Sequence, residues 1–197
     1  YIIKTFNKKR KLKLWQQQEC MSHLVLSVNV SSRQFHQADF VQKVTSAIER
    51  YAINPQLLKL ELTESMLLQN IDATIATMLS LKKLGVQFSL DDFGTGYSSL
   101  QYLKRLPLDQ LKIDQSFVRD VVIDENDRTI VRTIIVMADN LALEIIAEGV
   151  ETEEQRDILL MEGCAHYQGY LFSKPLPIDE FEIWFKNHIN SYTNTDV

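Results

Sequence analysis

Residues 90–100 of this chain read Leu90-Asp91-Asp92-Phe93-Gly94-Thr95-Gly96-Tyr97-Ser98-Ser99-Leu100. The apolar run 86–90 before them predicts a buried strand, and the two glycines allow a sharp turn after it, before a serine-capped helix. Two aspartates at such a strand end can converge on a hard cation, because carboxylate oxygens are among its preferred ligands. Aspartate and glycine are also ordinary turn residues, so the pair by itself leaves a plain polar loop equally open.

Strand-like and helix-like segments alternate along the rest of the chain. The strand-like runs are 24–30, 58–62, 86–90, 111–114, 143–147 and 165–170. Helical spacing marks 1–19, 35–51, 71–84, 100–103, 127–141, 152–161 and 178–189. This alternation predicts an α/β fold with a parallel sheet and helical crossovers. No repeat or low-complexity linker divides the sequence, so we expect one domain over residues 1–189 and a polar tail over residues 190–197.

Polar residues at the strand ends distinguish between two parallel architectures. Each lies at or just after the carboxyl end of a different predicted strand: Asn29, Glu61, Asp91, Lys112 and Glu148. An open doubly wound sheet uses one or two strand ends near its switch point, whereas a closed barrel brings every strand end to one rim. The sequence therefore predicts a (β/α)8 barrel of the TIM type. Only about six strands are visible where such a barrel needs eight, so we expect the first strand or strands to lie upstream.

Composition excludes several classes of protein. Hydrophobic residues make up 45% of the chain and charged residues 24%, as in ordinary globular proteins. The net charge of −5 gives no support to binding a nucleic acid polymer. No run approaches the roughly 18 apolar residues of a membrane span, so we expect no membrane contact by this domain. Cys20 and Cys164 lie far apart without metal-ligand spacing, which predicts reduced thiols in the cytoplasm.

The predicted rim is dominated by carboxylates. The carboxylates are Glu61, Asp91, Asp92 and Glu148, and Asn29 adds a neutral oxygen. Converging carboxylates repel one another unless cations bind between them, and oxygen ligands favour Mg²⁺ or Mn²⁺ over Zn²⁺. Such a two-metal site suits phosphoester hydrolysis, with Lys112 as a positive donor to the attacking water or the phosphate. Taken singly, each residue also has a structural explanation, such as a strand cap or a solvent-facing lysine.

Six ordered motifs carry a resemblance to a known family. They are Ser27-Val28-Asn29-Val30-Ser31, Glu61-Leu62-Thr63-Glu64-Ser65, the stretch 91–100, Leu111-Lys112-Ile113-Asp114, Ala147-Glu148-Gly149-Val150-Glu151 and Gln168-Gly169-Tyr170. In these the chain resembles the EAL (Glu-Ala-Leu) domain family, bacterial phosphodiesterases that open cyclic di-GMP to linear pGpG. The resemblance extends to about Phe185. It implies a modified (β/α)8 barrel with one antiparallel strand.

The resemblance also implies a set of metal ligands. Asn29, Glu61 and Asp91 correspond to the ligands of a first Mg²⁺ or Mn²⁺ ion. Asp91 and Asp92, together with Glu148, correspond to the groups that serve a second ion. Two metal ions are therefore the cofactors we expect from the resemblance.

Residues around the metals receive roles from the same resemblance. Lys112 corresponds to the lysine that orients water, and Glu148 to the proposed general base. Glu151 and Gln168 correspond to groups that face the nucleotide or support the ligands. Glu64 corresponds to the residue that holds the loop after Asp92 in its working position.

One departure from the family pattern bears on activity. The Glu-Ala-Leu segment, whose glutamate is a ligand of the first metal, has no counterpart here and would lie upstream of Tyr1, as would an arginine that contacts a substrate phosphate. Either the sequence begins late or the protein is a shortened, inactive relative. We favour the first, because a barrel open at one seam exposes unpaired strand edges.

Three functions follow as hypotheses. The leading one is a metal-dependent cyclic di-GMP phosphodiesterase, active only if the upstream ligand is present. The alternatives are a non-hydrolysing cyclic di-GMP receptor and a protein-interaction domain. We further expect a cytoplasmic domain that can form a homodimer and is fused to sensor or cyclase domains in a longer protein.

Overall fold

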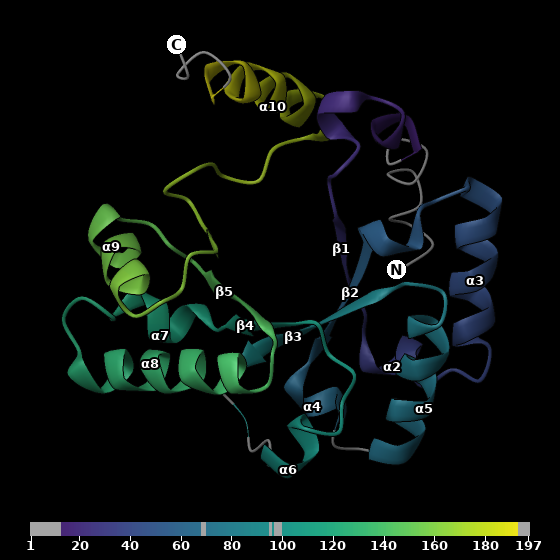
Figure 1. Ribbon diagram of the computed structural model, residues 1–197, viewed down its shortest axis with the longest axis horizontal. Coiled ribbons are helices and arrows are strands. Elements are labelled where there is room, and N and C mark those ends of the chain that lie inside the picture. Colours follow the sequence, from purple (N-terminus) through teal and green to yellow (C-terminus); the bar gives the residue numbers. More distant parts are fainter. Residues whose placement is uncertain (1–12, 68–69, 95, 97–99, 193–197) are drawn as a thin grey trace.

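Six parallel strands form one curled sheet in this computed structural model, which describes residues 13–67, 70–94, 96 and 100–192. The strands pair in the order in which they occur along the chain, and all five pairings are parallel. They are β1 (Leu26–Asn29), β2 (Leu58–Thr63), β3 (Gln87–Phe93), β4 (Gln110–Ile113), β5 (Glu144–Glu148) and β6 (Tyr167–Gln168). Figure 1 shows the strands following a curve with most helices on its outer side.

Helices connect successive strands. The α-helices are α2 (Ser32–Phe35), α3 (Phe40–Tyr51), α4 (Glu64–Leu67), α5 (Ile71–Lys82), α6 (Leu100–Leu103), α7 (Gln115–Arg119), α8 (Glu125–Asn140), α9 (Glu153–Met161) and α10 (Ile178–Tyr192). Two 3-10 helices, η2 (Glu19–Met21) and η3 (Pro55–Leu57), precede β1 and β2. Among the described helices, none is long and apolar enough to cross a membrane.

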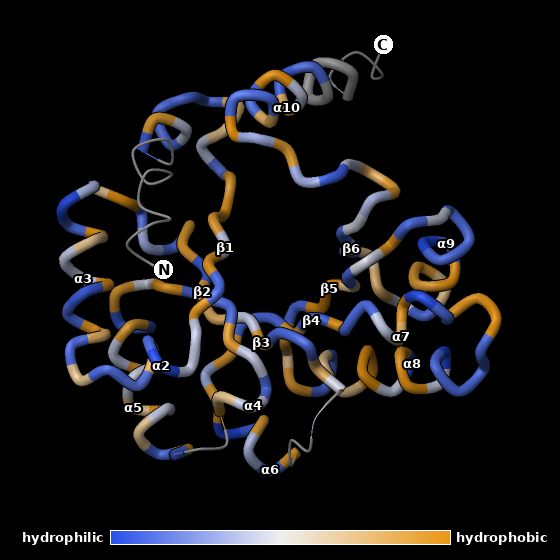
Figure 2. The backbone as a smooth tube through the Cα atoms, turned by 180° about the vertical axis from the view of Figure 1, so that it is seen from behind, coloured by the Kyte–Doolittle hydropathy of each residue, from blue (hydrophilic) through white to orange (hydrophobic). Residues whose placement is uncertain are grey.

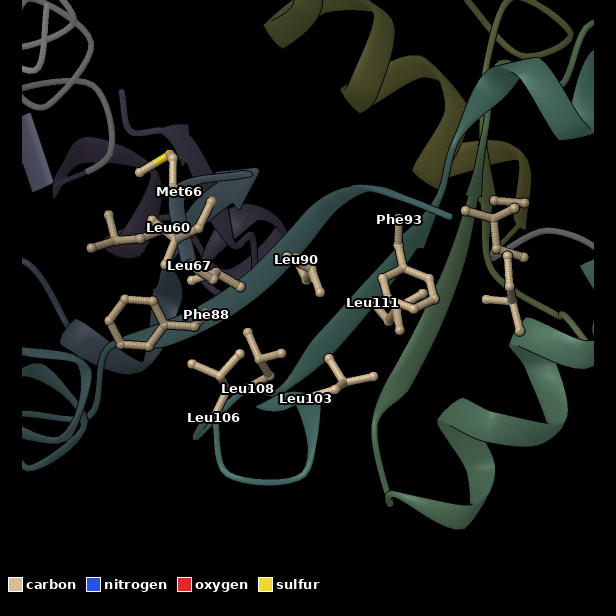
Figure 3. Close-up of a cluster of buried hydrophobic side chains, with 14 of the residues drawn as sticks. Leu60, Met66, Leu67, Phe88, Leu90, Phe93, Leu103, Leu106, Leu108 and Leu111 are labelled. Atoms are coloured by element: carbon tan, nitrogen blue, oxygen red, sulfur yellow. The ribbon is translucent and has the colours of Figure 1, made fainter. Parts of the chain in front are cut away.

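The side-chain period of the strands separates an apolar outer face from a polar inner face. Successive strand residues point to opposite sides of a sheet. Leu60 and Leu62 of β2 are almost completely buried, as are Phe88 and Leu90 of β3, and Figure 3 shows several of these side chains in one cluster. Burying each such side chain contributes about 1.5–3 kcal/mol. The intervening residues, among them Glu61, therefore point to the inside of the curve.

A second apolar cluster joins the two ends of the described chain. Trp15, Met21 and Ile53 form its buried centre. Phe181 of α10 packs against Trp15 with ring centroids 5.5 Å apart, and the Trp15 indole N–H donates to Glu182 Oε1 at 2.7 Å. Helix α10 thus lies beside the segment that precedes β1, as Figures 1 and 2 show from opposite sides.

Capping residues explain where several helices begin. Asn70, Asp114 and Asp124 each accept a hydrogen bond from a backbone amide two or three residues onward, at the starts of α5, α7 and α8. Thr152 begins α9 with a capping box that it shares with Gln155. These local signals fix helix boundaries independently of the sheet.

The curled parallel sheet with outer helices confirms the predicted α/β barrel-type architecture. No antiparallel pair occurs among the described strands, so the antiparallel strand implied by the resemblance stays a prediction, as does the domain boundary at residue 189.

Some element boundaries differ from those predicted. Strand β3 continues to Phe93 instead of ending at residue 90, the helix predicted to begin at residue 35 begins only at Phe40 as α3, and the last strand is only Tyr167–Gln168. Of the predicted helix 1–19, residues 1–12 lie outside the described residues. Helices α2, α4 and α7 were not predicted, because helices of four or five residues seldom show a clear helical periodicity.

Candidate metal centre and active site

Residues at the carboxyl ends of four strands meet around one lysine. Lys112, in β4, has a side chain only 6% exposed, and its Nζ lies 2.8 Å from Asp91 Oδ1 and 2.5 Å from Glu148 Oε1. The same Nζ is 3.4 Å from Glu61 Oε1. Strands β2, β3 and β5 therefore each contribute one carboxylate to a single ammonium group. Asn29 pairs in register with Glu61 and lies beside it at the exposed end of β1.

The charges in this cluster do not balance one to one. Burial alone would lower the pKa of Lys112, but its hydrogen bonds to Asp91 and Glu148 and its attraction to Glu61 outweigh burial and raise that pKa above the ordinary value. Lys112 is therefore protonated at neutral pH. Burial raises the pKa of Glu148, although Lys112 opposes the change. Because three carboxylates share one ammonium, the cluster favours additional positive charge.

A bulge in β3 turns two adjacent aspartates toward the same site. Consecutive strand residues normally point to opposite faces. The pairing of β3 with β4 shifts register between Leu90 and Phe93, and Asp92 adopts a left-handed backbone conformation with φ 54°. Asp91 Oδ1 accepts a hydrogen bond from the Asp92 amide at 3.2 Å. The bulge re-aims Asp92, as bulges beside functional sites commonly do.

Asp91, Asp92 and Glu148 could together hold a cation. Each offers a carboxylate oxygen, and these oxygens lie within 4.8 Å of one another. Burial raises the pKa of Asp92, and so do the neighbouring carboxylates of Asp91 and Asp114. An all-oxygen donor set of this kind fits Mg²⁺, Mn²⁺ or Ca²⁺. Among the described residues, Glu61 contacts Lys112 but lies outside this three-residue group.

A cavity of about 470 Å³ opens beside Glu148. Gln168 holds Glu148 at its edge, since the Gln168 Nε2 donates to Glu148 Oε1 at 2.6 Å. Glu151 and Gln168 both line the cavity, as do residues that sequence reasoning missed: Gln115, Tyr170, Lys174, Phe181 and Trp184. A cavity of this volume suits a small organic ligand. The tyrosine in the Gln168-Gly169-Tyr170 motif was the only sequence signal for the aromatic lining.

Glu64 contacts the loop that follows β3. It is 4% exposed, begins α4, and accepts a hydrogen bond from the Gly96 amide at 3.2 Å. A Cβ at residue 96 would lie 2.7 Å from the Glu64 carboxyl group, so any larger residue there would displace that carboxyl group. Residues 95 and 97–99 of this loop lie outside the described residues. Glu64 therefore both begins α4 and contacts the loop after β3.

Comparison with known proteins gives consistent matches. A family model described as EAL domain matches residues 5–175. The curated protein "Cyclic di-GMP phosphodiesterase NbdA" of Pseudomonas aeruginosa is 46% identical over 159 residues, which are 81% of this chain and 20% of that protein. The chain thus spans about a fifth of the length of the curated relatives it first matches.

Solved structures agree with the sequence matches. The structure "PaMucR Phosphodiesterase, c-di-GMP complex", of the Pseudomonas aeruginosa protein MucR, superposes with a TM-score of 0.85 at 40% identity, covering 89% of this chain and 70% of that chain. A Klebsiella pneumoniae structure, the BlrP1 manganese/cy-diGMP complex at pH 9.0, superposes with a TM-score of 0.75 at 29% identity, covering 86% of this chain and 43% of that one.

Proposed function

The chain belongs to the EAL domain family, and on that premise we propose that it is a divalent-metal-dependent phosphodiesterase that opens cyclic di-GMP to linear pGpG. The observation that carries the proposal is the group of Asp91, Asp92 and Glu148 around Lys112 at the edge of a cavity. Relatives named as cyclic di-GMP phosphodiesterases at 46% and 38% identity support the substrate.

The proposed cofactors are two Mg²⁺ or Mn²⁺ ions. Asp91, Asp92 and Glu148 would hold one ion, and Asn29, Glu61 and Asp91 the other. When bound, such ions polarise a phosphate and make a water molecule acidic enough to attack it. The oxygens within 4.8 Å of one another support the first of these sites, and the pairing of Asn29 with Glu61 supports the second.

The protein's own groups would orient the water and move its proton. Lys112 is charged and buried, so it can hold a water or a phosphate oxygen by a hydrogen bond. Glu148 is the proposed proton acceptor, because burial raises its pKa and makes it a better base than an exposed glutamate. Gln168 fixes one oxygen of Glu148. Glu64 is proposed to hold the loop after β3 through the Gly96 amide.

The cavity beside Glu148 is proposed to take part of the dinucleotide. Glu151 and Gln168 supply hydrogen-bonding groups, while Tyr170, Phe181 and Trp184 supply aromatic surface. Aromatic side chains stack on nucleobases without reading their sequence. We also propose a cytoplasmic setting, which the two free cysteines favour, and fusion to sensor or cyclase domains, which the long relatives favour.

A receptor that binds cyclic di-GMP without cleaving it is the second candidate. The cavity beside Glu148 would hold the dinucleotide in a receptor as well as in an enzyme, so a turnover assay is needed to separate the two.

Glu148→Gln tests the proposal, with the exposed Glu154→Gln on α9 as a matched control. Purified protein that includes the expected upstream strand is incubated with Mn²⁺ and cyclic di-GMP, and pGpG is measured by chromatography while dinucleotide binding is measured by calorimetry. We expect the parent and Glu154→Gln to form pGpG, and Glu148→Gln to lose turnover by at least about 100-fold. Binding without turnover in the parent would favour the receptor, and absence of both would contradict both functions.

A further inference from the structure

Gln155 is a buried amide that joins two segments next to the metal centre. It lies in the first turn of α9 and is 6% exposed. Its Oε1 accepts hydrogen bonds from the backbone amides of Glu151 at 2.7 Å and Thr152 at 3.0 Å. Its Nε2 donates to the carbonyl oxygen of Arg119 at 3.1 Å. One side chain therefore ties the loop after β5 to the last residue of α7.

The tied loop is the one that follows Glu148. Gly149 has φ +73°, and a Cβ there would lie 2.7 Å from the Cβ of Gln115, so the first residue of α7 packs directly on the loop. On the other side of the loop, a Cβ at Gly169 would lie 2.1 Å from the carbonyl oxygen of Val150. The loop thus lies tightly between α7 and the end of β6.

The other end of α7 reaches Asp92. Asp114, the cap residue just before α7, accepts a hydrogen bond from the Ser116 amide at 2.8 Å, and its carboxylate lies near enough to that of Asp92 to raise the pKa of Asp92. The segment of Asp114 and α7 therefore lies beside Asp92 at its cap residue and beside the loop after Glu148 at Gln115. The far end of α7 is anchored by Val118, which is fully buried in the core, and the bond from Gln155 to Arg119 adds a polar tie at its last residue.

We propose that Gln155 is a positioning residue for the metal centre, which keeps α7 and the loop after β5 fixed so that Asp92 and Glu148 stay close enough to share one cation. This inference rests on the proposed function, since it concerns the same cation. The mechanism is indirect: Gln155 binds only backbone groups, and α7 transmits their placement to the two carboxylates. Residues that hold metal ligands in place in this way typically change metal affinity by about 10–100-fold when substituted.

Two substitutions of Gln155 and one control separate this role from helix capping. Gln155→Glu keeps an acceptor for the amides of Glu151 and Thr152 but cannot donate to Arg119. Gln155→Leu removes all three bonds. Thr152→Ala is the control. It removes the hydroxyl that accepts a hydrogen bond from the backbone N–H of Gln155 at 3.2 Å, and it leaves the Gln155 side chain unchanged.

The readout is the dissociation constant for Mn²⁺, measured by calorimetry on the full 197-residue chain, together with the melting temperature. We expect both Gln155 variants to raise this constant by about tenfold or more, and Thr152→Ala to lower the melting temperature without changing the constant. The added charge of Gln155→Glu would by itself attract Mn²⁺, so weaker binding by this variant cannot come from electrostatics. A Gln155→Glu protein that binds Mn²⁺ as the parent does would overturn the proposal.

Hydrogen exchange separates failure of this inference from failure of the proposed function. If the parent binds no Mn²⁺, the metal-dependent function is refuted, and the amides of α7 are then compared without metal. Faster exchange of residues 115–119 in Gln155→Glu supports the positioning role, since none of those amides bonds to Gln155 in the parent. Equal exchange in the two proteins overturns it.

Discussion

Replacing Lys112 by methionine removes the ammonium group that three carboxylates share. Its Nζ lies 2.8 Å from Asp91, 2.5 Å from Glu148 and 3.4 Å from Glu61. Removing one partner of a buried ion pair typically costs about 3–5 kcal/mol, because the remaining charge is left buried and unpaired. For a chain of this size each kcal/mol shifts the melting temperature by about 2–4 °C, so without metal we expect a decrease of about 6–20 °C.

Metal should reverse much of that loss. A divalent cation supplies the positive charge that Lys112→Met lacks, so Mn²⁺ should raise the melting temperature more in the variant than in the parent. Turnover should still fall by at least about 100-fold, because the cation cannot replace the hydrogen bond from Lys112 to water or phosphate.

Lys59→Met is the matched control. Lys59 is also a buried lysine on the inner face, with a side chain 9% exposed, but within the described part of the chain its one ion pair is with Glu144, at 3.5 Å, and Glu144 is 65% exposed. We expect this variant to lose less stability and to gain no extra stabilisation from Mn²⁺, as measured by calorimetry with and without metal. Equal responses of the two variants to Mn²⁺ would refute the reasoning that Lys112 stands at a cation site.

Three other changes test separate parts of the structure. Glu162→Gln should destabilise the protein at pH 7, because the hydrogen bond from Arg132 lowers the pKa of Glu162 and favours its charged form. The parent and the variant should differ in melting temperature above pH 4.5, the ordinary pKa of a glutamate. This difference should disappear as the pH falls further, through the lower pKa that Glu162 has in the folded protein. Asp109→Asn should cost about 1–3 kcal/mol in urea unfolding, since Asp109 accepts both a β3 backbone amide at 2.7 Å and Lys82 at 2.5 Å, and an amide can match only part of this. Glu64→Ala should lower turnover and weaken its dependence on metal concentration with little change in stability, and normal kinetics would instead indicate that Glu64 merely begins α4.

Local sequence information was sufficient for the order of the elements. Alternation of apolar residues marks strands, and cap residues mark helix starts, so five of the six strands lie close to their predicted positions. Glu61 and Lys112 could be placed at the same rim as Asp91 because parallel strands bring their carboxyl ends to one edge. The family motifs supplied the expected chemistry of those residues.

Tertiary structure decided how those residues meet. The sequence allowed Asp91 and Asp92 to converge but did not decide it, because the turn of Asp92 beside Asp91 depends on the register of β3 against β4 and a backbone with φ 54°. It also gave no sign that Lys112 would be shared by three carboxylates, or that Gln155 would bind the carbonyl of Arg119, 36 residues away. Contacts of this kind depend on backbone groups and side chains that are distant in sequence, and only the packing of the whole sheet with its helices brings them within hydrogen-bonding distance.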